Sequence, residues 1–182
     1  MKTDNSHLQE KIDLRLDAVD GLRKDSVRVL ELFAGKSVLW THVKNERPLL
    51  DVKVLSVEKE KGKNPLAINA DNLKVIDNID LSRFDIIDID AYGIPFAQLD
   101  KIFRKGYHGI VVVTCISSMF GALPRGLVEV NGISVKMYEK IPSIFSPKMF
   151  AYMENYLYLS GVQSVKGYFL DDERKYYFYF KT

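Results

Sequence analysis

Short apolar segments of strand type alternate with segments of helical periodicity along most of this chain. A parallel pair of strands needs a long crossover, usually a helix, whereas antiparallel strands can follow one another directly. The alternation therefore predicts an α/β fold, with a mostly parallel sheet and helices on its faces. The expected strands cover residues 26–32, 51–58, 66–71, 84–90 and 107–116, and the expected helices cover residues 5–24, 37–44, 95–105 and 147–159.

The two ends of the chain are interpreted separately. Apolar residues at three- and four-residue spacings predict one amphipathic helix before the first strand, so residues 1–25 form an N-terminal helical segment. At the other end, SVKGYFL and YYFYF flank the turn DDERK, which predicts a terminal antiparallel hairpin. With 182 residues and 47% hydrophobic content, the chain fits one ordinary core, so residues 26–182 are expected to form a single domain.

Composition argues against several classes of protein. No window of about 18 apolar residues exists, and the polar N-terminus lacks the apolar region of a signal peptide, so a membrane span is not expected. A single cysteine, Cys115, excludes an internal disulfide and favours a cytoplasmic location. The three histidines lack metal-ligand spacing, so no metal site is expected. A net charge of +2 is compatible with nucleic acid as a partner.

The segment FDIIDIDAYGIP, residues 84–95, places carboxylates inside a strand that otherwise has a buried composition. Burying them is costly unless they are paired or reach water. Asp88 and Asp90 share one face under the two-residue period of a strand, and Asp90 ends the strand, where α/β sheets bind ligands. We therefore expect Asp90 in a functional site, with Asp88 supporting it or a cofactor. Asp85, at the start of the strand, is expected to be solvated.

Carboxylates also follow the other early strands. Glu31 precedes a tight Ala34-Gly35 loop, where the absence of a side chain lets a ligand approach the backbone. Glu58 ends the second strand, where an acid accepts hydrogen bonds from both hydroxyls of a ribose. Asp71 follows the third strand, where an acid can accept a hydrogen of an adenine amino group. Together these positions predict a nucleoside-binding edge of the sheet.

The motifs VLELFAG, SVEKE, NADN and DIDAYG, in this order, resemble those of class I S-adenosylmethionine-dependent methyltransferases. The resemblance covers residues 26–180 and implies a Rossmann-like fold whose last two strands are the terminal hairpin. It implies S-adenosyl-L-methionine as cofactor. The residues that it places around the cofactor are Glu31, Phe33, Ala34, Gly35, Glu58, Asp71 and Asn72.

DIDAYGIP is the most specific part of this resemblance. It looks like the Asp-x-Asp-Pro-Phe/Tyr-Gly stretch of tRNA guanine-N2 methyltransferases and the Asp-Pro-Pro-Tyr motif of amino-methylating enzymes, with Ala91 in place of a proline. The resemblance implies that Asp90 and the adjacent carbonyl hold the target amino group, that Tyr92 stacks on the base and that Gly93 shapes the turn. The implied reaction is methylation of an exocyclic amino group of a nucleic-acid base, in RNA rather than DNA.

Two features depart from the family pattern. Lys36-Ser37 stands where family loops usually carry a second glycine. The connection from Glu58 to Asp90 is also too short for the usual helix between the second and third strands, so we predict no full helix between Glu58 and Leu66. These departures favour an alternative, a non-catalytic module of the same fold that binds cofactor or RNA and regulates a partner.

Other hypotheses stay open at this point. Thr114-Cys115 resembles the Thr-Cys of RNA cytosine-C5 methyltransferases, in which that cysteine attacks the base, although a lone cysteine in an apolar strand is commonly a core residue. A nicotinamide-dinucleotide protein is disfavoured because the first loop lacks the three-glycine spacing. Residues 117–146 show no clear period, and the candidates for substrate contacts there are Phe120, Arg125 and Lys136.

Overall fold

The structure is a computed structural model that describes residues 7–117, 122–170 and 174–182. Its strands are β1 (Ser26–Leu32), β2 (Asp51–Glu58), β3 (Ile68–Asn69), β4 (Ile86–Asp90), β5 (Ile110–Ile116), β6 (Val165–Leu170) and β7 (Lys175–Lys181). Its α-helices are α1 (Leu8–Asp20), α2 (Val38–Glu46), α3 (Asn72–Asn78), α4 (Phe96–Arg104), α5 (Arg125–Val130), α6 (Val135–Lys140), α7 (Pro142–Phe145) and α8 (Met149–Leu159). Short 3₁₀ turns cover Leu81–Arg83 and Ser146–Lys148.

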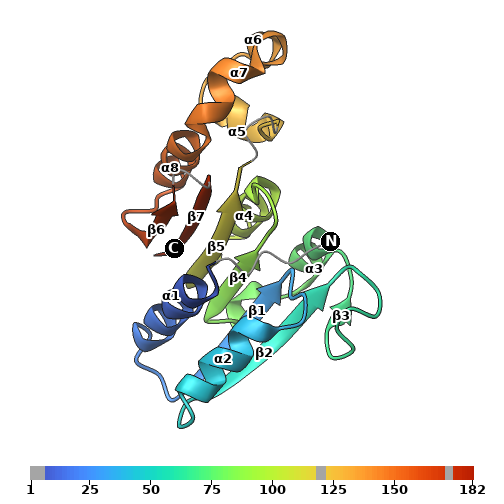
Figure 1. Cartoon of the computed structure of the whole chain (residues 1–182), viewed down its shortest axis with the longest axis vertical. Coiled ribbons are helices and arrows are strands. Elements are labelled where there is room, and N and C mark those ends of the chain that lie inside the picture. Colours follow the sequence, from blue (N-terminus) through green and yellow to red (C-terminus); the bar gives the residue numbers. More distant parts are fainter. Residues whose placement is uncertain (1–6, 118–121, 171–173) are drawn as a thin grey trace.

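The strands form one twisted sheet, in the order β3-β2-β1-β4-β5-β7-β6 (Figure 1). The strands β1 to β5 pair in parallel, whereas β7 is antiparallel to both β5 and β6. The predicted α/β class, the parallel sheet and the terminal hairpin are therefore confirmed. In this register Glu31 of β1 lies opposite Asp88 of β4, so these two carboxylates are neighbours in the sheet, near the carboxyl ends of their strands.

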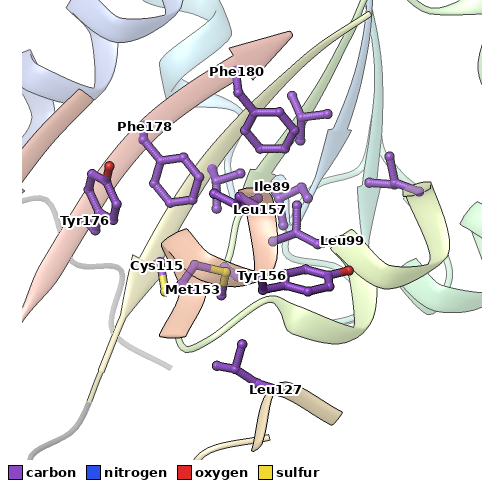
Figure 2. Packing of buried hydrophobic residues seen from close by; sticks show 14 of the residues in the cluster. Ile89, Leu99, Cys115, Leu127, Met153, Tyr156, Leu157, Tyr176, Phe178 and Phe180 are labelled. Atoms are coloured by element: carbon purple, nitrogen blue, oxygen red, sulfur yellow. The ribbon is translucent and has the colours of Figure 1, made fainter. Parts of the chain in front are cut away.

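Each face of the sheet has its own core. One cluster contains Ile87 and Ile89 of β4 with residues of α3, α4, α5 and α8, and Figure 2 shows its aromatic and aliphatic packing. The other contains Ile86 with residues of α1 and α2, which lie together across the opposite face (Figure 1). Because side chains alternate along a strand, Asp88 points to the same face as Ile86. The face covered by α1 and α2 therefore receives the carboxylates of β4.

The connection between β2 and β3 contains no helix in residues 59–67, as predicted. The chain instead returns beside β2, where Glu58 pairs with Asn69. The Asn69 side-chain amide donates to the backbone carbonyls of Glu58 and Lys59, both at 3.0 Å, and so closes the turn without a covering helix. The shortened connection reflects a third strand of only two residues at the edge of the sheet.

Several boundaries differ from the predicted ones. The third strand ends at Asn69 rather than Asp71, because the Asp71 side chain caps α3, a helix that the sequence interpretation missed. The fourth strand begins at Ile86 rather than Phe84, because a 3₁₀ turn ends at Phe84. The region without a clear period contains α5, α6 and α7, which stand beyond the end of the sheet (Figure 1). Within the described ranges, no helix combines the length and the apolar character needed to cross a membrane.

Candidate cofactor and acceptor site

A cavity of about 640 Å³ lies at the carboxyl ends of β1, β2 and β4. All but one of the site residues predicted from the sequence line it: Glu31, Phe33, Ala34, Gly35, Glu58, Asp71, Asn72, Asp90, Ala91 and Tyr92. Further lining residues are Leu8, Lys11, Lys36, Val38, Leu39, Lys59, Glu60, Lys63, Leu73, Gln98 and Ile116. The parallel sheet thus brings together residues that are far apart along the chain.

The loop after β1 turns sharply at the wall of the cavity. Gly35 has a φ of 53°, a left-handed conformation that glycine adopts without a side-chain clash. Phe33 and Ser37 also have positive φ values, of 61° and 54°, although they are not glycines. The Ala34 N–H donates to the carbonyl of Val57 at 3.0 Å, which ties the loop to β2. Such backbone conformations concentrate at ligand-binding sites, where surrounding contacts offset the strain.

Glu58 is held between two loops by backbone groups. Its Oε2 accepts a hydrogen bond from the Gly35 N–H and its Oε1 accepts one from the Glu60 N–H, both at 2.9 Å. The Lys63 Nζ lies 3.8 Å from the same Oε2. A carboxylate oxygen accepts two hydrogen bonds, so each Glu58 oxygen retains capacity for a ligand hydroxyl in the cavity.

Glu31 is almost fully buried at the end of β1. Its Oε2 accepts hydrogen bonds from the hydroxyls of Ser37 at 2.8 Å and of Ser56 at 2.6 Å. Burial is the largest influence and disfavours the ionised form, and the negative charge of Asp88 adds to it. The pKa of Glu31 is therefore raised from 4.5 to about 7, despite the two hydroxyl donors.

This raised pKa predicts a pH-dependent contribution to stability. The folded state binds the proton of Glu31 more tightly than the unfolded state, so the contribution is complete below pH 4.5 and is lost as the pH rises through about 7. Relative to the Glu31→Gln variant, the free energy of unfolding of the wild type should fall by about 3 kcal/mol across this window. Urea titrations of both proteins between pH 4.5 and 8 measure this difference. A constant difference would contradict the assignment.

Asp71 and Asn72 have different roles at the start of α3. Asp71 caps the helix, because its Oδ1 accepts from the Leu73 N–H at 3.0 Å, while its Oδ2 pairs with Lys59 at 3.1 Å. Asp71 therefore lines the cavity with Oδ1 committed to the helix cap and Oδ2 paired with Lys59, and its contact with an adenine amino group stays a prediction. Asn72 is 5% exposed, and its Oδ1 is buried without a hydrogen-bond partner among the described residues. An orphaned buried acceptor beside a cavity indicates a ligand donor.

Asp88 obtains its compensating charge from the N-terminal helix. The Arg15 guanidinium donates to both oxygens of Asp88, at 2.7 and 2.6 Å, and the Trp40 indole N–H donates to Oδ2 at 2.7 Å. Both members of the ion pair are fully buried. Trp40 lies in the core. A carboxylate in an apolar strand is thus tolerated because a bidentate arginine covers it.

Asp90 is paired with the same helix, one turn away. The Lys11 Nζ donates to Asp90 Oδ1 at 2.7 Å. Burial acts to raise the pKa of Asp90, but the positive charges of Lys11 and Arg15 outweigh it, so the pKa lies below its usual value. Asp90 is therefore an ionised carboxylate at the wall of the cavity. The sequence interpretation placed Asp90 at this edge but missed its lysine partner.

The residues after Asp90 form the turn into α4. Ala91 is buried in the core, whereas Tyr92 is 61% exposed and lines the cavity. Gly93 has a φ of 140° and its carbonyl accepts a hydrogen bond from the Ile116 N–H at 2.9 Å, which ties the turn to β5. Gly93 is the predicted residue that does not line the cavity; it shapes the turn instead. The exposed ring of Tyr92 excludes the alternative that it packs into the core.

Leu8 and Lys11 of α1, together with Gln98 of α4, are cavity residues that sequence analysis missed. A usable signal was present, because Lys11 and Arg15 lie four residues apart next to the apolar stripe of their helix. A basic pair on the buried side of a helix implies acidic partners. The spacing of Lys11 and Arg15 does not identify their acidic partners.

Several solved structures with this architecture are methyltransferases. CurJ carbon methyltransferase matches with a TM-score of 0.59 and 14% identity, over 99% of this chain and 55% of that chain. Precorrin-6y C5,15-methyltransferase from Geobacter metallireducens GS-15 matches with a TM-score of 0.52 and 12% identity, over 93% and 88%. The bifunctional kinase-methyltransferase WbdD matches with a TM-score of 0.58 and 10% identity, over 96% and 39%. The chain has a class I methyltransferase fold.

The methyltransferase fold is what these structures establish for the chain. No protein-family model and no curated protein sequence matches this chain. The chain spans about half of CurJ and two fifths of WbdD, and the similar structures are named for different chemistry. Because one fold hosts many functions, the fold alone does not assign an activity or a substrate to this chain.

Cys115 does not reach the site of this methyltransferase fold. It is fully buried in the core, its sulfur lies 3.9 Å from that of Met149, and Figure 2 labels it among the residues of the core cluster. Burial raises the pKa of its thiol to about 12. A buried, protonated thiol is a poor nucleophile, so the cytosine-C5 hypothesis is wrong on geometric and electrostatic grounds.

Two of the remaining candidates, Arg125 and Lys136, lie away from the cavity lining. Arg125 forms an exposed ion pair with Glu129 on α5, and Lys136 lies exposed on α6. Phe120 falls outside the described residues. In the described part of the chain, no group of three histidine, cysteine, aspartate or glutamate side chains is placed to hold a metal ion.

Proposed function

We propose that this chain is an S-adenosylmethionine-dependent methyltransferase acting on an exocyclic amino group of a nucleic-acid base, in RNA rather than DNA. The observation that carries the proposal is one cavity lined by Glu31, Glu58 and Asp90, which end three parallel strands, together with the Gly35 loop. In a methyltransferase fold, these positions supply acceptors for the donor groups of a charged nucleoside cofactor.

The residues present fit S-adenosylmethionine, which supplies an electrophilic methyl group on a sulfonium sulfur when bound. Glu58 is fixed by two backbone donors and would accept the ribose hydroxyls. The orphaned Oδ1 of Asn72 would accept from the adenine amino group. Glu31 and the Gly35 loop would hold the methionine end. The buried acceptor of Asn72 is the observation behind this fit, because it lacks a partner among the described residues.

The acceptor half of the cavity supports an amine and a planar ring. An ionised Asp90 can accept a hydrogen bond from an amino group, which orients the nitrogen lone pair for attack. The exposed Tyr92 offers a face on which an unpaired base can stack. Single-stranded RNA, with its unstacked bases, presents such an acceptor without the energy of opening a duplex.

Replacing Glu58 with alanine should weaken binding of S-adenosylmethionine by more than about tenfold, because charge-assisted hydrogen bonds to the ribose are lost. Isothermal titration calorimetry of the purified protein with S-adenosylmethionine, S-adenosylhomocysteine and NAD measures this effect and tests the cofactor class. Glu129→Ala, which removes an exposed acid from α5, is the control. Unchanged binding in Glu58→Ala would remove Glu58 from the site, and tighter binding of NAD would overturn the proposal.

The alternative of a non-catalytic module has one observation in its favour. Lys36 lines the cavity directly beside Gly35, so a cation stands near the proposed place of a sulfonium group. A protein that binds S-adenosylmethionine but transfers its methyl group to no base, tested with tritiated cofactor and single-stranded RNAs, would establish this alternative.

A further inference from the structure

Two ion pairs join α1 to β4 side by side. Lys11 and Arg15 lie four residues apart on the helix, which corresponds to a rise of about 6 Å. Asp88 and Asp90 lie two residues apart on the strand, a rise of about 6.6 Å. The matching distances let each cation meet its own carboxylate. The Arg15 Nη1 also donates to the backbone carbonyl of Lys11 at 2.8 Å, so the arginine pair fixes the helical turn that carries the lysine.

We propose that Lys11 is a positioning residue for Asp90: it holds one carboxylate oxygen and leaves the other to receive the acceptor amine. This inference rests on the proposed function and assigns to the N-terminal helix a part in it. The Lys11 Nζ contacts Oδ1 of Asp90, and the lysine side chain is 6% exposed whereas the aspartate side chain is 17% exposed. Both residues line the cavity, and the carboxylate is the more accessible of the two partners.

The role follows from what the acceptor requires. An ionised Asp90 accepts a hydrogen bond from the amine, which leaves the nitrogen lone pair free to attack. A protonated Asp90 would instead donate its proton toward that lone pair. Without a nearby cation, a partly buried carboxylate favours the protonated form and its side chain rotates more freely. Lys11 supplies both the charge and the fixed orientation.

Anchoring the helix does not require Lys11. The bidentate contact of Arg15 with Asp88, supported by Trp40, already attaches α1 to the sheet in a fully buried position. Lys11, by contrast, lies on the wall of the cavity. A second cation is thus placed where the proposed chemistry occurs rather than at the centre of the packing interface.

Several charged or titratable groups face this pair from the surrounding elements. On α1 and β4 they are Arg15 and Asp88, on β1 Glu31, which acts on Arg15, and on β7 Tyr177, whose ring centroid lies 5.4 Å from the Lys11 Nζ and 6.0 Å from the ring of His7. Arg15 supports the ionised form of Asp90, and Lys11 is its direct partner. Removal of Lys11 takes away a charge and a hydrogen bond that oppose the influence of burial, so the pKa of Asp90 should rise.

The test compares Lys11→Met and Lys11→Arg with the wild type in a methyl-transfer assay using tritiated S-adenosylmethionine and single-stranded RNA homopolymers of each base. Lys11→Met should lower kcat at pH 7 by about tenfold or more and move the acid limb of the kcat profile to higher pH. Lys11→Arg should restore most of the rate. The control is Lys24→Met, which breaks the more exposed Lys24–Asp85 ion pair near the start of the same strand and should leave kcat unchanged.

A second measurement reports on Asp90 without catalysis. In Lys11→Met the folded-state pKa of Asp90 should be higher than in the wild type, so the loss of stability relative to the wild type should grow as the pH rises through the range in which Asp90 ionises. An unshifted kcat profile in a folded Lys11→Met protein, or a pH-independent loss of stability, would overturn the inference. Absence of transfer by the wild type to every base would overturn the proposed function and this inference together. Transfer that Lys11→Met leaves intact would overturn the inference alone.

Discussion

Replacing Asp90 with asparagine should reduce methyl transfer to an RNA acceptor by about ten- to a thousandfold, the range for loss of one positioning contact or one electrostatic contact to the reacting group. The physical reason is that an amide at this position replaces a full negative charge with a dipole. Binding of S-adenosylmethionine should change much less, because Glu58 and Asn72 hold the nucleoside end in the proposed arrangement. Single-turnover assays with saturating cofactor measure the transfer step.

The matched control for this prediction is Asp85→Asn. Asp85 precedes the same strand, pairs with Lys24 and accepts a hydrogen bond from the Arg28 N–H at 2.8 Å, far from the cavity lining. The Asp85→Asn variant should lose some stability and retain the wild-type rate of methyl transfer per folded molecule. If Asp90→Asn melts normally and transfers the methyl group at the wild-type rate, the amine-positioning role of Asp90 is excluded.

The largest effect on stability should come from Arg15. Replacing it with methionine should lower the free energy of unfolding by about 3–5 kcal/mol, because the carboxylate of Asp88 is then buried without its counter-ion. Chemical denaturation at pH 7 gives this value directly. The fully buried, bidentate geometry of the pair is the reason for expecting so large an effect.

Two further variants separate buried charge from lost packing. Adding Asp88→Asn to Arg15→Met should recover most of the stability, because the uncompensated charge disappears while the Trp40 indole keeps an oxygen acceptor. Arg47→Met breaks the exposed Arg47–Asp20 pair and should cost less than about 1 kcal/mol. Equal losses for Arg15→Met and Arg47→Met would contradict the view that burial of Asp88 sets the effect.

These experiments concern one charge network with two ends. Arg15 and Asp88 form its fully buried end, and Lys11 and Asp90 form its end at the cavity. If both proposals hold, variants at the buried end should mainly change stability, and variants at the cavity end should mainly change the rate of methyl transfer. The site would then be active only when α1 is packed on the sheet.

The strand-end residues could be predicted because their placement follows from local periodicity. A run such as DVKVLSVE has the composition of a strand, and in a parallel sheet the carboxyl ends of such strands lie on one edge. The sequence therefore predicts that Glu31, Glu58 and Asp90 lie together, and in the structure they line one cavity. The absence of a helix after Glu58 could also be predicted from the sequence, because Gly62 and Pro65 interrupt that segment.

The division of tasks between Asp71 and Asn72 could not be predicted in the same way. Both residues belong to NADN, and either side chain can accept a hydrogen bond from a nucleoside. The start of α3 decides between them, because the first residue caps the helix and the second points its Oδ1 into a buried position. A helix start missed in the sequence thus makes the Asn72 Oδ1, rather than an Asp71 oxygen, the acceptor without a partner among the described residues.

The sequence by itself determined the alternation of strands and helices, the terminal hairpin, the sharp turn at Gly35 and the carboxylates at the edge of the sheet. Each of these depends on residues within a few positions of one another. Only the tertiary structure decided how Asp88 and Asp90 are compensated and that Cys115 lies in the core. Arg15 and Lys11 are separated from these aspartates by 73 and 79 residues, and they meet because α1 crosses the sheet. A buried charge depends on neighbours supplied by packing, and local sequence does not specify them.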